Sequence, residues 1–387
     1  MNALQAQNCV GAALRCQTTA GLLLAPLVTS ALRISSAPIH NTTQPARQFH
    51  ARTLHRFPPT RPRLYKRVPL PHRAFPVNTP KPRGYATTTP TTTEPVIHPV
   101  FEQRTGTFQY LVADASTNEA VIIDPVLDYD KCSHTITTTS ADALLSLVRE
   151  KGYNITRILE THAHADHLTA SFYLQRQLAG KQGNKPPVCI GNRIGRVQTF
   201  FAQRYGIEAD EYEGVFDELL GDDEEFEIGK LKAKAIHLPG HTPDHMGYMI
   251  GDNVFCGDSL FHTDIGTARC DFPGGSAHAL YHSARKVLSL PEHVKIWTGH
   301  DYPPEGVREP VPAVSVGEHR KTNRHLKDGV TEDEFVAMRS ERDSNLAAPR
   351  LLHESLQVNV RAGRLPKAND AGMRLMRVPL KVKAPGL

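Results

Sequence analysis

Histidine and aspartate side chains that can bind a metal ion are concentrated in one short segment of the chain. Six consecutive positions, between a predicted strand and a predicted helix, contain His162, His164, Asp166 and His167. Sites in α/β proteins form in loops at the carboxyl ends of strands. His162 and His164 are two residues apart, so both imidazoles can approach an ion from one extended segment. Asp166 and His167 would approach it from the following helical turn. The segment therefore predicts a metal centre.

Three more residues able to bind metal follow in order, each just after a predicted strand: His241, Asp258 and His300. Each is weak evidence alone, because an isolated histidine at a strand end is more often a structural hydrogen-bonding group. Together with the first segment they give five histidines and two aspartates on four loops. The remaining histidines, among them His245, lack this context and are assigned no role.

The elements that must position these loops alternate between strands and helices. The patterns predict strands at Thr107–Ala113, Glu119–Asp124, Ile155–Leu159, Val188–Gly191, Glu224–His237, Met246–Ile250, Asn253–Gly257 and Lys295–Thr298. Helices are predicted at Ala141–Lys151, Asp166–Gln177, Ala277–Leu288, Val316–Leu326 and Glu332–Arg342. Such alternation predicts a mixed sheet with helices outside.

The chain joins two segments of different charge. Residues 1–93 contain twelve basic and no acidic residues, whereas the rest contains 33 basic and 40 acidic residues. An acid-poor, Arg- and Ser-rich beginning is typical of a mitochondrial presequence, with a cleavage site expected near Ala86. A secretory signal, a nucleic-acid-binding arm and a disordered tail without an address are the alternatives. Residues 94–302 are the predicted core, and residues 303–387 are a helical extension and basic tail that complete the same domain.

Two function classes are disfavoured by composition. The longest apolar run, Ala20–Leu32, is interrupted by Pro26, Thr29 and Ser30 and is shorter than a membrane-spanning helix requires. The six cysteines are scattered and form no CxxC pair, which favours a reducing compartment over a disulfide scaffold. We therefore expect a protein without a membrane span that is stabilised by its core.

The order HxHxDH, His241, Asp258 and His300 resembles the metal-ligand pattern of the metallo-β-lactamase superfamily, over about residues 101–365. The resemblance implies an α/β fold, an αββα sandwich with the metal at one edge and a helical C-terminal extension. Five stretches are similar to the persulfide dioxygenase branch, particularly to its bacterial-type group: Val121–Val126, Glu160–His167, Thr267–Gly275, Glu332–Arg339 and Arg361–Pro366. The first two are shared with glyoxalase II-like thioesterases, and the last three are specific.

The resemblance implies one Fe(II) per chain, bound by His162, His241 and Asp258 as a two-histidine, one-carboxylate triad. The other four residues, His164, Asp166, His167 and His300, would then support and orient these ligands. The alternative is a two-metal site with two Zn(II) or a mixed Zn/Fe pair, in which Asp258 bridges the ions and the other four residues take part in binding them. Spacing alone does not decide between one metal and two.

Arg269 and Tyr302 match positions that line the substrate pocket in persulfide dioxygenases. Arg269 would bind a glutathione carboxylate and Tyr302 the substrate or oxygen; the alternatives are a salt bridge for Arg269 and packing under a loop for Tyr302. The expected activity is oxidation of glutathione persulfide with O₂ to sulfite and glutathione, in hydrogen sulfide metabolism of the mitochondrial matrix. The alternatives are a glyoxalase II-like hydrolase of glutathione thioesters and, if the basic arm is retained, a nucleic-acid binder or nuclease. The expected partners are small molecules, with no nucleic acid and no membrane; a homo-oligomer is left open.

Overall fold

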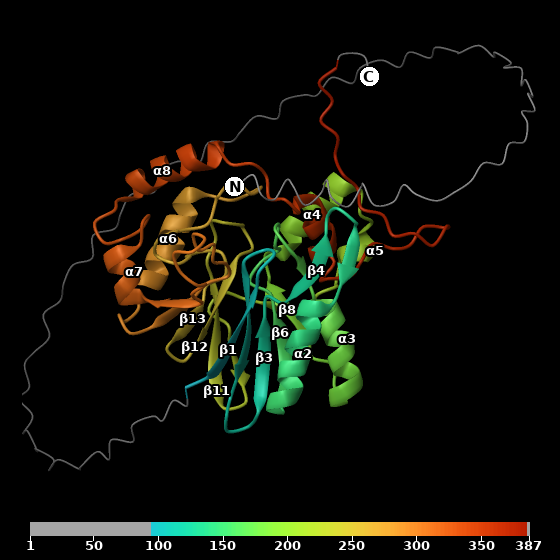
Figure 1. The fold of residues 1–387 in the computed structure, drawn as a ribbon, viewed down its shortest axis with the longest axis horizontal. Coiled ribbons are helices and arrows are strands. Elements are labelled where there is room, and N and C mark those ends of the chain that lie inside the picture. The colour runs from blue at the N-terminus through green and yellow to red at the C-terminus, as the bar shows by residue number, and fades with distance from the viewer. Residues whose placement is uncertain (1–93, 385–387) are drawn as a thin grey trace, which may run out of the picture. The chain divides into compact units, whose positions relative to one another are not determined.

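The computed structural model describes residues 94–384, so the predicted presequence and its cleavage site lie outside the described residues. Within this range two six-stranded sheets pack face to face, with helices on their outer sides (Figure 1). This arrangement confirms the predicted αββα sandwich, and the helices after residue 303 confirm the helical C-terminal extension.

The first sheet has the strand order β1-β2-β3-β6-β8-β9. Its strands are β1 (Val96–Glu102), β2 (Thr107–Ala113), β3 (Glu119–Ile123), β6 (Asn154–Leu159), β8 (Val188–Gly191) and β9 (Glu218–Leu220). Strands β1 to β3 pair antiparallel, and β3, β6, β8 and β9 pair parallel. Because β3, β6, β8 and β9 are parallel, the loops that follow these strands lie at the same edge of the sheet.

The second sheet has the order β10-β11-β12-β13-β14-β15. Its strands are β10 (Glu225–Ile228), β11 (Leu231–His237), β12 (Met246–Ile250), β13 (Asn253–Phe255), β14 (Lys295–Trp297) and β15 (Ala313–Ser315). Between the two sheets lies an apolar cluster that includes Tyr110, Tyr248 and Phe255. The rings of Tyr110 and Phe255 meet edge to face with centroids 5.0 Å apart, joining one sheet to the other.

Helices cover both outer faces. One apolar cluster joins the first sheet to α2 (Thr139–Lys151), α3 (Ser171–Gln182), α4 (Ile194–Tyr205) and α9 (Leu352–Asn359). The other joins the second sheet to α6 (Ala277–Leu288), α7 (Val316–Thr322) and α8 (Glu332–Ser344). The short helix α5 spans Ala209–Tyr212, and a small sheet contains β5 (Thr135–Thr137), β4 (Val126–Asp130) and β7 (Leu168–Thr169).

Three predicted elements are wrong in their bounds, and the helix predicted at Val316–Leu326 ends already at Thr322. The predicted strand Glu224–His237 is a hairpin, because Gly229 has φ +60° and the chain turns back there between β10 and β11. The helix predicted from Asp166 begins only at Ser171, because β7 first pairs with β4. Asp166 and His167 therefore lie in a loop and not on a helical turn.

Among residues 94–384 no helix is long and apolar enough to cross a membrane. Cys189, Cys256 and Cys270 are buried free thiols. Burial raises the pKa of the Cys189 thiol well above its usual value and raises those of Cys256 and Cys270 to about 12, so these thiols stay protonated and act as small core residues.

Candidate metal centre

The fold brings four loops to one edge of the sandwich. Strand β12 is antiparallel to both β11 and β13, and β13 is parallel to β14, so β11, β13 and β14 point the same way. Their carboxyl ends lead into His241, Asp258 and His300 respectively, and β6 of the other sheet leads into the loop of residues 162–167. All seven predicted site residues are thereby brought into one region.

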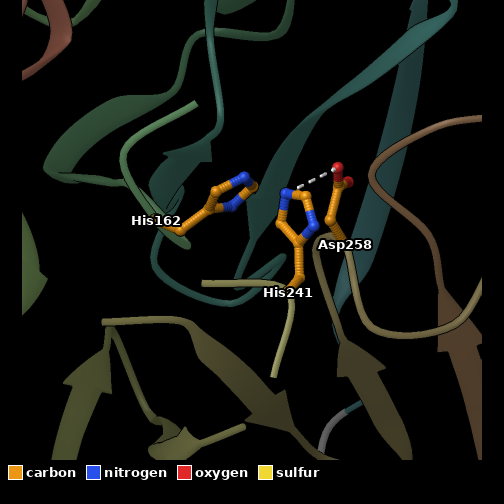
Figure 2. Close-up of side chains that lie close together, drawn as sticks. All are labelled: His162, His241 and Asp258. Carbon is orange, nitrogen blue, oxygen red and sulfur yellow. Dashed lines mark ion pairs between the residues drawn. The ribbon is translucent and has the colours of Figure 1, made fainter. Parts of the chain in front are cut away.

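His162, His241 and Asp258 form a compact group. They are all buried, and each offers a ligand atom that lies within 4.8 Å of the others. Figure 2 shows the two imidazoles and the carboxylate converging, with His241 Nε2 3.7 Å from Asp258 Oδ2. This spacing suits a cation bound between the three side chains better than direct contacts among them.

The other predicted residues form overlapping groups beside the first. His164, Asp166 and His167 place ligand atoms within 4.8 Å of one another, as do Asp166, Asp258 and His300. His300 Nε2 lies 3.1 Å from Asp166 Oδ2 and 3.5 Å from Asp258 Oδ1. The Asp258 carboxylate therefore lies between the two groups, with one oxygen facing His241 and the other facing His300.

Unpartnered atoms give an independent test of whether these residues fit a metal ion. On the seven predicted metal-site residues, six buried side-chain atoms form no hydrogen bond: His162 Nε2, His164 Nδ1, Asp166 Oδ2, His167 Nε2, Asp258 Oδ1 and His300 Nε2. Of these, Asp166 Oδ2 and His300 Nε2 face each other at 3.1 Å. Buried polar atoms are normally satisfied, and leaving one unpaired costs about 1–3 kcal/mol. A set of convergent nitrogen and carboxylate atoms is the donor set of Zn(II) and Fe(II) sites, so the residues fit a metal ion.

The Nδ1 atoms of three of these histidines lie within hydrogen-bond distance of oxygen atoms of the protein. His241 Nδ1 lies 2.7 Å from the Arg269 carbonyl oxygen, and His300 Nδ1 lies 3.3 Å from that of Gly106. His162 Nδ1 lies 3.0 Å from Thr161 Oγ1. A carbonyl accepts only from a protonated nitrogen, so His241 and His300 present Nε2 as the lone-pair nitrogen toward the centre.

Two buried carboxylates lie behind His164. Its Nε2 is 3.1 Å from Asp124 Oδ1 and 3.4 Å from Glu160 Oε2. Burial by itself lowers the pKa of His164, but Asp124 and Glu160 together raise it well above its ordinary value. Asp124 also accepts hydrogen bonds from the Thr161 backbone N–H and hydroxyl, so it fixes the start of the loop as well.

The pKa shifts of three further residues favour ligand-competent forms, whereas burial raises the pKa of Asp258, and Asp258 and Asp166 outweigh burial to raise that of His300. Burial and the neighbouring His164 lower the pKa of His162 well below its usual range and that of His167 to about 3. Burial opposes ionisation of Asp166, but His300 and His167 lower its pKa to about 2. At neutral pH His162 and His167 are therefore uncharged and Asp166 is an anion, which are the forms that bind metal.

Close packing at the Asp258 loop requires glycine. Gly257 has φ +47°, and a Cβ there would lie 2.6 Å from Thr161 Oγ1 and 2.9 Å from His245 Nε2. A Cβ on Gly299 would lie 2.5 Å from Asp258 Oδ1. Both positions allow the backbone of one loop to approach the side chains of another.

His245, which the sequence leaves without a role, lies inside the site. It is fully buried, its ring stacks on His162 with centroids 4.8 Å apart, and its Nε2 accepts a 2.9 Å hydrogen bond from the Asp258 backbone N–H. Burial and the neighbouring His241 lower its pKa well below the usual value. The only sequence signal was its place four residues after His241, which does not distinguish it from a structural histidine.

Arg269 and Tyr302 lie at the periphery of the centre. The Arg269 guanidinium pairs with both Asp271 oxygens at 2.5 and 2.6 Å, which is the salt-bridge alternative expected from the sequence, and its backbone carbonyl holds His241. The Tyr302 ring stacks on His300, with centroids 5.6 Å apart and planes at 7°, and is 51% exposed. Their roles toward a substrate stay predictions.

Comparison with known proteins agrees with this geometry. The metallo-beta-lactamase superfamily profile matches residues 103–300. A beta-lactamase hydrolase-like protein of Xylella fastidiosa is 43% identical over 74% of this chain, and the match spans 65% of that relative's length. "Glyoxylase B2" of Dictyostelium discoideum is 43% identical, with 73% of this chain and 96% of that protein covered.

Two further matches are to proteins named ETHE1. The mitochondrial persulfide dioxygenase ETHE1 of Bos taurus is 29% identical over 69% of this chain and 89% of that protein. The crystal structure of ETHE1 from Myxococcus xanthus aligns with a TM-score of 0.56 and 27% identity, covering 70% of this chain and all of that one. The chain therefore belongs to the metallo-beta-lactamase superfamily and to its ETHE1-like branch.

Proposed function

We propose that this protein is an iron-dependent persulfide dioxygenase that oxidises glutathione persulfide. The observation that carries the proposal is the buried group of His162, His241 and Asp258, with ligand atoms within 4.8 Å of one another. Two histidines and one carboxylate are the ligand set of non-haem Fe(II) oxygenases. The likeness to the bovine persulfide dioxygenase and to the Myxococcus structure supports this choice within the superfamily.

The reaction balances as glutathione persulfide, O₂ and water giving glutathione, sulfite and two protons. The S–S bond breaks, the glutathione sulfur leaves as a thiol, and O₂ accepts four electrons. One Fe(II) per chain would leave coordination positions open for substrate sulfur and O₂. Arg269 is proposed to bind a glutathione carboxylate, and Tyr302, half-exposed beside His300, to bind the persulfide end.

The test combines metal analysis with oxygen consumption. We expect the purified protein to contain one iron per chain and to consume O₂ and release sulfite when glutathione persulfide is added. His162→Ala should abolish both, whereas His293→Ala, which changes an exposed histidine paired with Asp252, should preserve both. Two zinc ions per chain without O₂ uptake would refute the proposal.

A second function has a specific observation in its favour. The Asp258 oxygens face His241 at 3.7 Å and His300 at 3.5 Å, a placement that would suit a carboxylate shared between two metals. Two Zn(II), or a mixed Zn/Fe pair, would supply a hydroxide nucleophile near neutral pH. The Dictyostelium relative named "Glyoxylase B2" supports a glyoxalase II-like hydrolase of glutathione thioesters. Hydrolysis of S-lactoylglutathione without O₂ would favour this function over the dioxygenase.

We also propose that the protein acts in the mitochondrial matrix. The support is the absence of acidic residues in residues 1–93 and the mitochondrial naming of the bovine relative. N-terminal sequencing of the protein from isolated mitochondria should give a start near Ala86. A mature chain that retains the twelve basic residues of this segment would instead favour the nucleic-acid-binding alternative.

A further inference from the structure

The C-terminal extension contacts the candidate metal centre through one buried amide. Asn359 is the last residue of α9 and is 3% exposed. Its Nδ2 donates to the backbone carbonyls of His164 and His167, both at 2.8 Å. Its Oδ1 accepts from the Thr169 backbone N–H at 2.9 Å. The two N–H donors and the oxygen acceptor of the Asn359 side chain therefore all form hydrogen bonds with the backbone of residues 164–169.

These three hydrogen bonds replace ones that secondary structure would otherwise supply. The loop between β6 and β7 is neither helix nor strand, so its buried carbonyls need partners from elsewhere. The two carbonyls that Asn359 binds lie on either side of Asp166, and the N–H it accepts from lies in β7. One side chain therefore fixes both ends of the segment that presents His164, Asp166 and His167.

We propose that Asn359 is a positioning residue of the metal centre, so that the C-terminal extension sets the geometry of the loop that carries these three residues. The inference rests on the proposed metal binding and deepens it. Asn359 touches no ligand atom; it acts through the backbone. Losing its hydrogen bonds leaves the metal-binding side chains present but free to change their mutual distances, which metal binding is sensitive to.

The decisive substitution is Asn359→Asp, which keeps the size and the acceptor oxygen but replaces the two donors with an oxygen that faces two carbonyls. The matched control is Leu356→Ala, on the same helix and fully buried, which removes packing but none of these three hydrogen bonds. Both variants are made in the full chain and depleted of metal, and their folding is compared by circular dichroism. Co(II) is then titrated, with visible absorption reporting both affinity and coordination geometry.

We expect Asn359→Asp to bind Co(II) about 10- to 100-fold more weakly than the wild type, with shifted absorption bands. Leu356→Ala should unfold at a lower temperature yet keep wild-type affinity and bands. Wild-type affinity and bands in Asn359→Asp, or equal losses in both variants, would overturn the positioning role. A wild-type protein that binds no Co(II) would refute the metal centre itself, and the two failures are therefore distinguishable.

Discussion

Replacing His245 with phenylalanine tests whether this histidine holds the Asp258 ligand. The substitution keeps a flat ring that can stack on His162 but removes Nε2, which accepts the 2.9 Å hydrogen bond from the Asp258 backbone N–H. A buried N–H left without its acceptor costs about 1–3 kcal/mol. Because that N–H belongs to a proposed ligand, part of the cost should appear as weaker metal binding.

Supporting groups of this kind typically change metal affinity by about 10- to 100-fold. That range corresponds to about 1.4–2.8 kcal/mol, since each tenfold is about 1.4 kcal/mol. Leaving the Asp258 backbone N–H unpaired can account for a loss of metal affinity of this size, without any change in the metal-binding side chains themselves. We therefore expect His245→Phe to bind metal about 10- to 100-fold more weakly, and His245→Gln, which can offer an acceptor oxygen, to lose less.

The assay is equilibrium competition for Zn(II) against a chromophoric chelator, with thermal unfolding measured in parallel. The control is His319→Phe, because His319 is also buried but bonds to Asn323 and not to a proposed ligand. His319→Phe should reduce stability and leave metal affinity unchanged. Wild-type affinity in His245→Phe, or equal losses in both variants, would refute the reasoning.

Three further outcomes are expected. With one metal bound by the triad, His162→Ala should remove it and His167→Ala should keep much of it, as counted by elemental analysis; a fall from two metals to one in His167→Ala would instead show a two-metal site. Burial raises the pKa of Asp114, but hydrogen bonds from the backbone of Lys230 and from neighbouring groups outweigh burial and lower this pKa to about 2 from 3.8. The ionised carboxylate therefore contributes to stability above about pH 4, and this contribution is lost as the pH falls through about 2. Urea unfolding should therefore show Asp114→Asn destabilised more at pH 7 than at pH 2, and an equal effect at both would contradict this. Arg339→Ala should lower the free energy of unfolding by about 3–5 kcal/mol, because it leaves the buried Asp343 carboxylate without its partner; a loss below about 1 kcal/mol in urea titration would be inconsistent with it.

Local sequence determined the elements and the identity of the ligand candidates. Strands β2, β8 and β12 and helix α6 have the predicted bounds, because a buried strand or an amphipathic helix is specified by the period of its own apolar residues. Metal-competent side chains at strand ends indicated the site in the same way, since residue type and place along the chain are local properties. The bounds failed where partners far along the chain decide the conformation: pairing of β7 with β4 delays α3 to Ser171.

Only the tertiary structure decided which residues support the ligands and from which direction. His245 and Asn359 carry no motif, and they became recognisable only when their hydrogen bonds to Asp258 and to the His164–Thr169 loop were visible. Asn359 is 195 residues from His164, and no local sequence pattern indicates a contact over such a separation. The physical reason is that a ligand's identity depends on its own side chain, whereas its orientation depends on buried hydrogen bonds that form only when distant elements pack together.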